Sequence, residues 1–176
     1  MYKEVTGNLI TLAQNGHFDV ITHGCNCFCT MGAGLAPQMA KAFGCDKFKM
    51  EGDEYEGDVN KLGTIDWQEL MVSTVSYHPK DYKGVVTQEL KHNLIVVNSY
   101  SQYGFGRNHK EGSVAPLDYE ALCLCLRKMN KLWKGKRIGL PQIGCHLAGG
   151  DWNIVKEMIQ DELVDCDVTV VIYDAK

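Results

Sequence analysis

The hydrophobic positions of this chain follow two spacings that alternate along its length. Short runs rich in β-branched and aromatic residues predict strands at Tyr2–Thr6, Asp19–His23, Leu70–Ser76, Leu94–Tyr100, Arg137–Pro141 and Val168–Tyr173. Leu94–Val97 and Val168–Tyr173 are apolar on both faces, which is typical of strands covered from both sides. Strands that alternate with helix-like segments predict an α/β fold with helices on both faces of one sheet.

Apolar residues recur at helical spacing between these strands. The predicted helices are Leu35–Phe43, Asp118–Lys134 and a last helix that begins at Asp151. Pro37 stands near the start of the first helix, where a missing N–H costs nothing, and Gly44 follows its end. Asp118 and Asp151 are suited to cap the N-termini of the other two helices.

The segments between these elements have weaker patterns. Cys45–Trp67 is acidic and is interpreted as a short helix and an edge strand with a solvated face; a metal site is the less favoured alternative. Tyr77–Asn93 is interpreted as an extra hairpin. Gln102–Pro116 contains several glycines and is interpreted as a mobile loop near a site.

Length and charge narrow the function classes. A chain of 176 residues predicts one domain over 1–176, and its net charge of -4 offers no electrostatic argument for nucleic-acid binding. The first residues lack the apolar stretch of a signal peptide, and no apolar run is long enough to cross a bilayer. We therefore expect a cytoplasmic monomer without a membrane partner.

The eight cysteines do not change that expectation. In reducing cytosol they are expected to remain free thiols. His23–Cys29 contains a C-x-C-x-C pattern, but structural zinc sites usually have C-x₂-C pairs, and no second pair matches it. We therefore expect no metal.

Two loops that contain glycine each follow a predicted strand and precede a predicted helix. They are Gly24–Gly34 and Gln142–Gly150. Glycines allow backbone N–H groups to approach an anion, and the N-terminus of the following helix adds a positive dipole. Because open α/β sheets bind ligands at the carboxyl ends of their strands, the two loops together predict a cradle for a phosphate or diphosphate.

Polar and titratable residues lie in or beside these loops. His23 closes a strand and is either an acid–base group or a core histidine satisfied by a backbone carbonyl. Asn26 is suited to hold ribose hydroxyls. For Asp151 a helix cap is the favoured interpretation, and the His146 side chain is either catalytic or in solvent. Cys145 is expected to pack under its loop.

Several sequence blocks, in this order and spacing, resemble those of macrodomains. They are Thr6–Leu9, His23–Cys27, Met31–Ala36, Val97–Gln102 and Leu140–Trp152, and together they extend over nearly the whole chain. Among macrodomains, the chain most resembles ADP-ribose-1''-phosphate phosphatases and the related terminal ADP-ribose glycohydrolases.

This resemblance implies a three-layer α/β/α sandwich with a mixed central sheet that binds ADP-ribose. Asn8 would contact adenine, and Tyr173 lies in the region that stacks on it. Asn26 would hold the distal ribose. The ligand-binding residues that the resemblance implies are Asn8, Leu9, Asn26, Met31, Gly32, Ala33, Gly34, Leu35, Ile143, Gly144, Cys145, His146, Leu147 and Tyr173.

The resemblance also implies a reaction. His23 matches the histidine of the phosphatase group, with Asp151 as a second catalytic candidate. The glycohydrolase group has an Asp where this chain has Ala148, and a catalytic Lys where it has Ser101-Gln102. The sequence therefore predicts a cofactor-independent phosphatase that converts ADP-ribose-1''-phosphate to ADP-ribose. The alternatives are a module that binds ADP-ribose without turnover and a hydrolase that removes ADP-ribose from macromolecules.

Overall fold

A six-stranded mixed sheet forms the centre of the molecule. The computed structural model describes residues 1–48, 56–77, 86–106 and 114–173. The strands are β1 (Tyr2–Thr6), β2 (Val20–Asn26), β3 (Ile65–Tyr77), β4 (Val86–Gln102), β5 (Arg137–Leu140) and β6 (Asp167–Ile172). Their order is β1-β6-β5-β2-β4-β3, and every neighbouring pair is parallel except β3 with β4.

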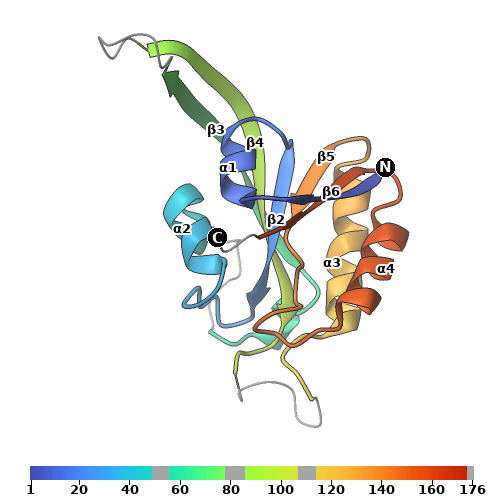
Figure 1. Ribbon diagram of the computed structural model, residues 1–176. Coiled ribbons are helices and arrows are strands. Elements are labelled where there is room, and N and C mark those ends of the chain that lie inside the picture. The colour runs from blue at the N-terminus through green and yellow to red at the C-terminus, as the bar shows by residue number, and fades with distance from the viewer. Residues whose placement is uncertain (49–55, 78–85, 107–113, 174–176) are drawn as a thin grey trace.

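The predicted strands are all present, but the two on one side of the sheet are longer than expected. β3 pairs with β4 from Ile65↔Ser99 to Tyr77↔Val86. The predicted extra hairpin at Tyr77–Asn93 is therefore not a separate unit, because its described residues continue β3 and β4. The two strands leave the body of the sheet as a ribbon (Figure 1). Residues 78–85 lie outside the described residues.

The helices are α1 (Leu9–Gln14), α2 (Ala36–Phe43), α3 (Tyr119–Leu132) and α4 (Trp152–Glu162). Asp118 and Asp151 cap α3 and α4, accepting hydrogen bonds from the backbone N–H groups of Ala121 and Asn153. α2 ends at Gly44, which adopts a left-handed conformation. α1 was not predicted from the sequence, because a helix of six residues is too short to show a clear apolar period.

The segment between α2 and β3 contains the short helical turns Cys45–Lys47 and Val59–Lys61. The first turn agrees with the predicted short helix, and the predicted edge strand is the start of β3, which lies at the edge of the sheet. Several of its acidic residues lie in 49–55, outside the described residues, as do 107–113 of the predicted mobile loop.

Helices cover both faces of the sheet, so the predicted three-layer α/β/α sandwich is confirmed (Figure 1). α3 and α4 pack on one face over a core that includes Leu122, Leu126 and Ile159. α1 and α2 pack on the other face over a core that includes Ala13 and Met39. Burial of this apolar surface is the main driving force that holds the layers together.

Gly139 gives a direct test of packing between the sheet and the segment that joins α1 to β2, where Phe18 lies. An ideal Cβ at this β5 residue would lie 2.6 Å from the ring of Phe18. We expect Gly139→Ala to lower the free energy of unfolding by about 1–3 kcal/mol, because overpacking forces neighbours out of position. Urea denaturation measures the change. Adding Phe18→Leu should recover part of the loss, and an undiminished loss in the double variant would contradict this explanation.

Candidate functional site

The carboxyl ends of β2, β4 and β5 lie at one edge of the sheet, which we call the crest. Parallel strands place these ends together, and β2 points to this edge at the bottom of Figure 1. The first loop (residues 27–35) follows β2, and the second loop (residues 141–151) follows β5. The predicted meeting of the two loops at one edge therefore agrees with the topology.

The side chain of Asn26 shapes the first loop. Its Oδ1 accepts hydrogen bonds from the backbone N–H groups of Phe28 at 3.1 Å and Thr30 at 3.2 Å. Its Nδ2 donates to the carbonyl oxygen of Thr30 at 2.9 Å. Asn26 is 7% exposed. The side-chain amide predicted to hold a ribose is thus mostly bonded to the backbone of the loop. One of its two amide hydrogens remains for a ligand.

Close packing against Leu117 shapes the second loop. An ideal Cβ added at Gly144 would lie 2.6 Å from one Leu117 methyl group, and one added at Gly150 would overlap the other Leu117 methyl group. Gly150 also donates from its N–H to the Gly144 carbonyl oxygen at 2.9 Å. Cys145 packs under the loop as predicted, with its thiol 3.4 Å from the Ile143 carbonyl oxygen. Glycine is needed here because side chains would open this tight turn.

The two loops contact each other across the crest. An ideal Cβ at Gly34 would lie 3.1 Å from the Leu147 Cδ1. Within the described residues, a set of loop N–H groups makes no hydrogen bond: those of Met31, Gly32, Ala33, Gly34, Leu35, Gly144, His146, Leu147 and Ala148. The unpaired N–H groups of the first loop directly precede α2, and such groups at the start of a helix are donors suited to an anion. The second loop adds unpaired N–H groups in a turn that contains glycine.

Three predicted ligand residues lie at the ends of β1 and β6. Asn8 caps α1, and its Oδ1 accepts from the Thr11 N–H at 3.1 Å. Leu9 is 4% exposed and packs in the core with α1 and α2. Tyr173 directly follows β6 and is 65% exposed, so its ring is available to stack on a flat group.

His23 lies in the interior and not on the surface of the crest. Its side chain is 1% exposed, and its Nε2 lies 2.9 Å from the Asn98 Oδ1. Thiols of Cys25 and Cys45 surround the same ring, at 3.7 Å and 3.6 Å from Nε2. Burial lowers the pKa of His23 to about 4. This placement favours the core-histidine interpretation, with an asparagine oxygen in place of the expected backbone carbonyl.

The exposed titratable side chains of the second loop are His146 and Asp151. The Asp151 Oδ1 accepts from the Asn153 N–H at 2.8 Å, which confirms the predicted cap. Within the described residues its Oδ2 makes no hydrogen bond. Asp151 can therefore stabilise α4 with one oxygen and offer the other to a ligand.

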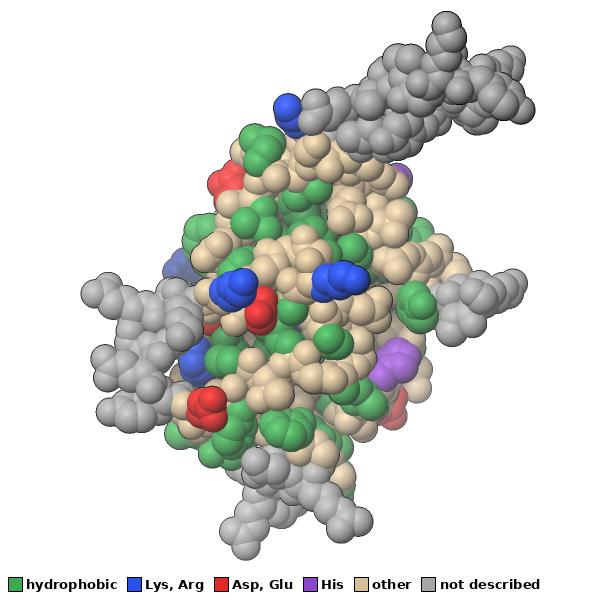
Figure 2. Space-filling model, turned by 90° about the vertical axis from the view of Figure 1, so that its left-hand side faces the viewer, with side chains coloured by type: hydrophobic (Ala, Val, Ile, Leu, Met, Phe, Trp, Pro, Cys, Tyr) green, Lys and Arg blue, Asp and Glu red, His purple; other side chains and the backbone are tan. Residues whose placement is uncertain are grey.

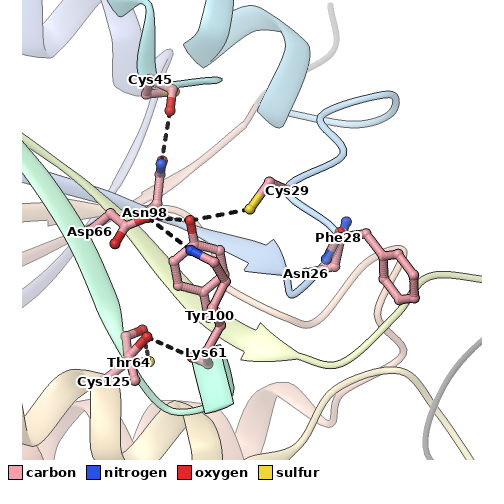
Figure 3. Close-up of polar contacts among 10 residues, drawn as sticks. All are labelled: Asn26, Phe28, Cys29, Cys45, Lys61, Thr64, Asp66, Asn98, Tyr100 and Cys125. Atoms are coloured by element: carbon pink, nitrogen blue, oxygen red, sulfur yellow. Dashed lines mark hydrogen bonds and ion pairs between the residues drawn. The ribbon is translucent and has the colours of Figure 1, made fainter. Parts of the chain in front are cut away.

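A buried charged cluster that was not expected from the sequence lies beside the first loop and is formed by Lys61, Asp66 and Tyr100 (Figure 3). The Tyr100 hydroxyl donates to the Asp66 Oδ2, and the Lys61 Nζ lies 3.7 Å from that oxygen. Lys61 falls in the acidic segment that was interpreted as a solvated face. Only the pairing of β3 with β4 brings Asp66 and Tyr100 together, so residue spacing carried no signal for it.

Other site classes find no support in the described part of the chain. No group of three or more His, Cys, Asp or Glu side chains is arranged there to hold a metal ion. No helix in those residues combines the length and apolar character that a membrane span requires. On the face seen in Figure 2, the Lys and Arg side chains are scattered among acidic and uncharged ones and do not form a basic patch.

Comparison with known sequences shows similarity to a phage protein. No protein-family model matches the chain. The chain is 28% identical over 180 residues to an uncharacterized 17.5 kDa protein in the tk-vs intergenic region of Enterobacteria phage T4. The match covers 98% of this chain and 96% of the phage protein.

Solved structures with the same fold include macrodomains. The macrodomain of Mycobacterium tuberculosis DarG superposes with a TM-score of 0.57 at 17% identity, over 100% of this chain and 99% of that one. Thermosipho africanus DarTG, solved in complex with ADP-ribose, gives a TM-score of 0.60 at 17% identity, over 98% of this chain and 41% of that one. The chain therefore has the macrodomain fold.

Proposed function

We propose that the crest binds ADP-ribose with its diphosphate between the two loops, and that the protein hydrolyses ADP-ribose-1''-phosphate to ADP-ribose and phosphate. The observation that carries the proposal is that both loops have unpaired backbone N–H groups. The two loops also lie against each other, where Gly34 meets Leu147. Preorganised backbone donors stabilise phosphate charge without a metal or a cationic side chain. The shared fold with a protein solved with ADP-ribose supports the same ligand.

The polar residues around the loops agree with one orientation of this ligand. Exposed Tyr173 would stack on adenine, with the Asn8 backbone and amide beside it. The distal ribose would lie over the first loop, next to the free amide hydrogen of Asn26. Asp151 would then stand near the 1'' phosphate and activate the attacking water. The water oxygen bonds to phosphorus as its proton passes to Asp151. The bond between phosphorus and the C1'' oxygen breaks, and that oxygen takes up a proton from solvent, which gives ADP-ribose and phosphate.

Two measurements test the proposal separately. Isothermal titration calorimetry with ADP-ribose tests binding, and release of inorganic phosphate from ADP-ribose-1''-phosphate tests turnover. Absence of binding would refute the proposed ligand. Binding without phosphate release would refute only the phosphatase activity and leave a binding module, an alternative that the buried position of His23 favours. Loss of label from ADP-ribosylated macromolecules, without phosphatase activity, would instead identify the third sequence-based alternative.

Asp151 is the residue through which turnover can be tested without unfolding the protein. We expect Asp151→Asn to lower the rate of phosphate release by roughly 10²-fold or more, because an amide cannot act as a general base. Asparagine is also a good helix cap, so the melting temperature and the affinity for ADP-ribose should change little. Asp118→Asn makes the same replacement at the cap of α3 and serves as the control. Equal rates for the two variants would exclude Asp151 from the reaction.

A further inference from the structure

The buried cluster of Lys61, Asp66 and Tyr100 places two charged side chains and a tyrosine hydroxyl away from water. These side chains come from the turn before β3, from β3 and from β4, and they are 6%, 3% and 2% exposed. The Lys61 Nζ also lies 4.6 Å from the centre of the Tyr100 ring. Removing charges from water is costly, and buried ion pairs often stabilise a fold no more than apolar residues would. A role in fixing a local conformation is the better-supported use of such groups.

The cluster reaches the first loop through Cys29. The Cys29 thiol lies 3.6 Å from the Tyr100 hydroxyl oxygen, as Figure 3 shows. That hydroxyl donates its own hydrogen to Asp66, so its oxygen is left to accept from the thiol. Burial and the neighbouring Asp66 carboxylate raise the pKa of Tyr100, which keeps the hydroxyl protonated in this arrangement.

Cys29 is also the point at which the loop backbone is strained. Its φ is 55°, and it is the one non-glycine residue of the described chain with a positive φ. The left-handed region costs an L-residue roughly 1–2 kcal/mol, so tertiary contacts must hold it there. The backbone N–H of Cys29 donates to the Asn26 carbonyl oxygen at 3.0 Å. Directly after this residue come Thr30 and the unpaired N–H groups of the loop.

We propose that Lys61, Asp66 and Tyr100 are positioning residues that hold Cys29 in its left-handed conformation and thereby orient the first loop for the ligand diphosphate. This inference rests on the proposed function. The cluster does not touch the ligand; it acts through the hydroxyl–thiol contact. Loss of that contact lets the first loop leave its present conformation, so affinity falls although the residues that would contact the ligand are unchanged.

A double-mutant cycle on ADP-ribose affinity tests this proposal. We expect Tyr100→Phe and Cys29→Ala each to raise the dissociation constant about 5–10-fold, and the double variant to raise it no further than the larger single effect. Residues that act through one contact are non-additive in this way. Calorimetry gives the dissociation constants, and a melting curve for each variant gives its stability. Tyr2→Phe, which removes a tyrosine hydroxyl bonded to Glu4 away from the crest, should leave affinity unchanged.

The outcomes separate this proposal from the proposed function. If the wild type binds ADP-ribose and Tyr100→Phe binds equally well with a lower melting temperature, the cluster is only structural and the positioning role is overturned. Additive effects in the double variant overturn it as well, because they show separate routes to the ligand. If Tyr100→Phe does not fold, an unchanged affinity in Cys29→Ala overturns the proposal by itself. If the wild type does not bind, the proposed function and this inference fail together.

Discussion

Acidification from pH 7 to pH 4 is expected to remove on the order of 3 kcal/mol of unfolding free energy through His23 alone. Burial lowers the pKa of His23 from 6.5 to about 4 in the folded state. Between these values the unfolded chain binds a proton that the folded chain excludes. The stabilisation from this group is therefore complete above pH 6.5 and is lost as the pH falls toward 4.

Urea denaturation at a series of pH values measures this effect. We expect His23→Gln to be less stable at neutral pH but to lose much less stability than the wild type across the same window. The matched control is His17→Gln, because His17 is exposed and its removal should leave the wild-type slope intact. If the unfolding free energy of His23→Gln falls with decreasing pH as steeply as that of the wild type, other groups cause the acid sensitivity.

Loss of ADP-ribose binding on the order of 100-fold is expected for Gly34→Val. Gly34 has a φ of +67°, which β-branched residues avoid, and its Cβ position lies 3.1 Å from the Leu147 Cδ1. Valine would therefore both strain the first loop and push it away from the second. Because a 100-fold change corresponds to about 2.7 kcal/mol, loss of a few well-aligned N–H contacts is sufficient to produce it.

Gly44→Val separates these two causes. Gly44 has the same φ of +67°, at the end of α2, but an added Cβ there would meet nothing within 4 Å. This control should be destabilised by backbone strain and still bind ADP-ribose with an affinity close to that of the wild type. If Gly34→Val also retains its affinity in calorimetry, the contact between the loops is not part of the binding site.

Because His23 is buried, we assign the proposed reaction to residues on the surface of the crest and not to His23. A ring that is 1% exposed and bonded to Asn98 cannot meet a substrate without disturbing the core. Asp151 and His146 carry exposed titratable groups on the second loop and do not have this limitation. Strand periodicity predicted where β2 runs but not which of its side chains remains open to a ligand.

Local features were predictable from the sequence because neighbouring residues determine them. Pro37 and Gly44 bracket α2, Asp118 and Asp151 cap their helices, and apolar runs predict the strands. The glycines of the two loops predicted backbone donors at the crest for the same reason. α1 was missed, because a helix of six residues depends on packing more than on its own pattern.

The sequence by itself determined the alternation of strands and helices, the helix ends and the two loops that carry unpaired N–H groups, since these depend on spacing and backbone preference within a few residues. Only the tertiary structure decided the burial of His23 and the gathering of Lys61, Asp66 and Tyr100 beside Cys29. These contacts join residues far apart in the chain, through the pairing of β4 with β2 and β3. Strand register and desolvation control them, and neither can be read from local spacing.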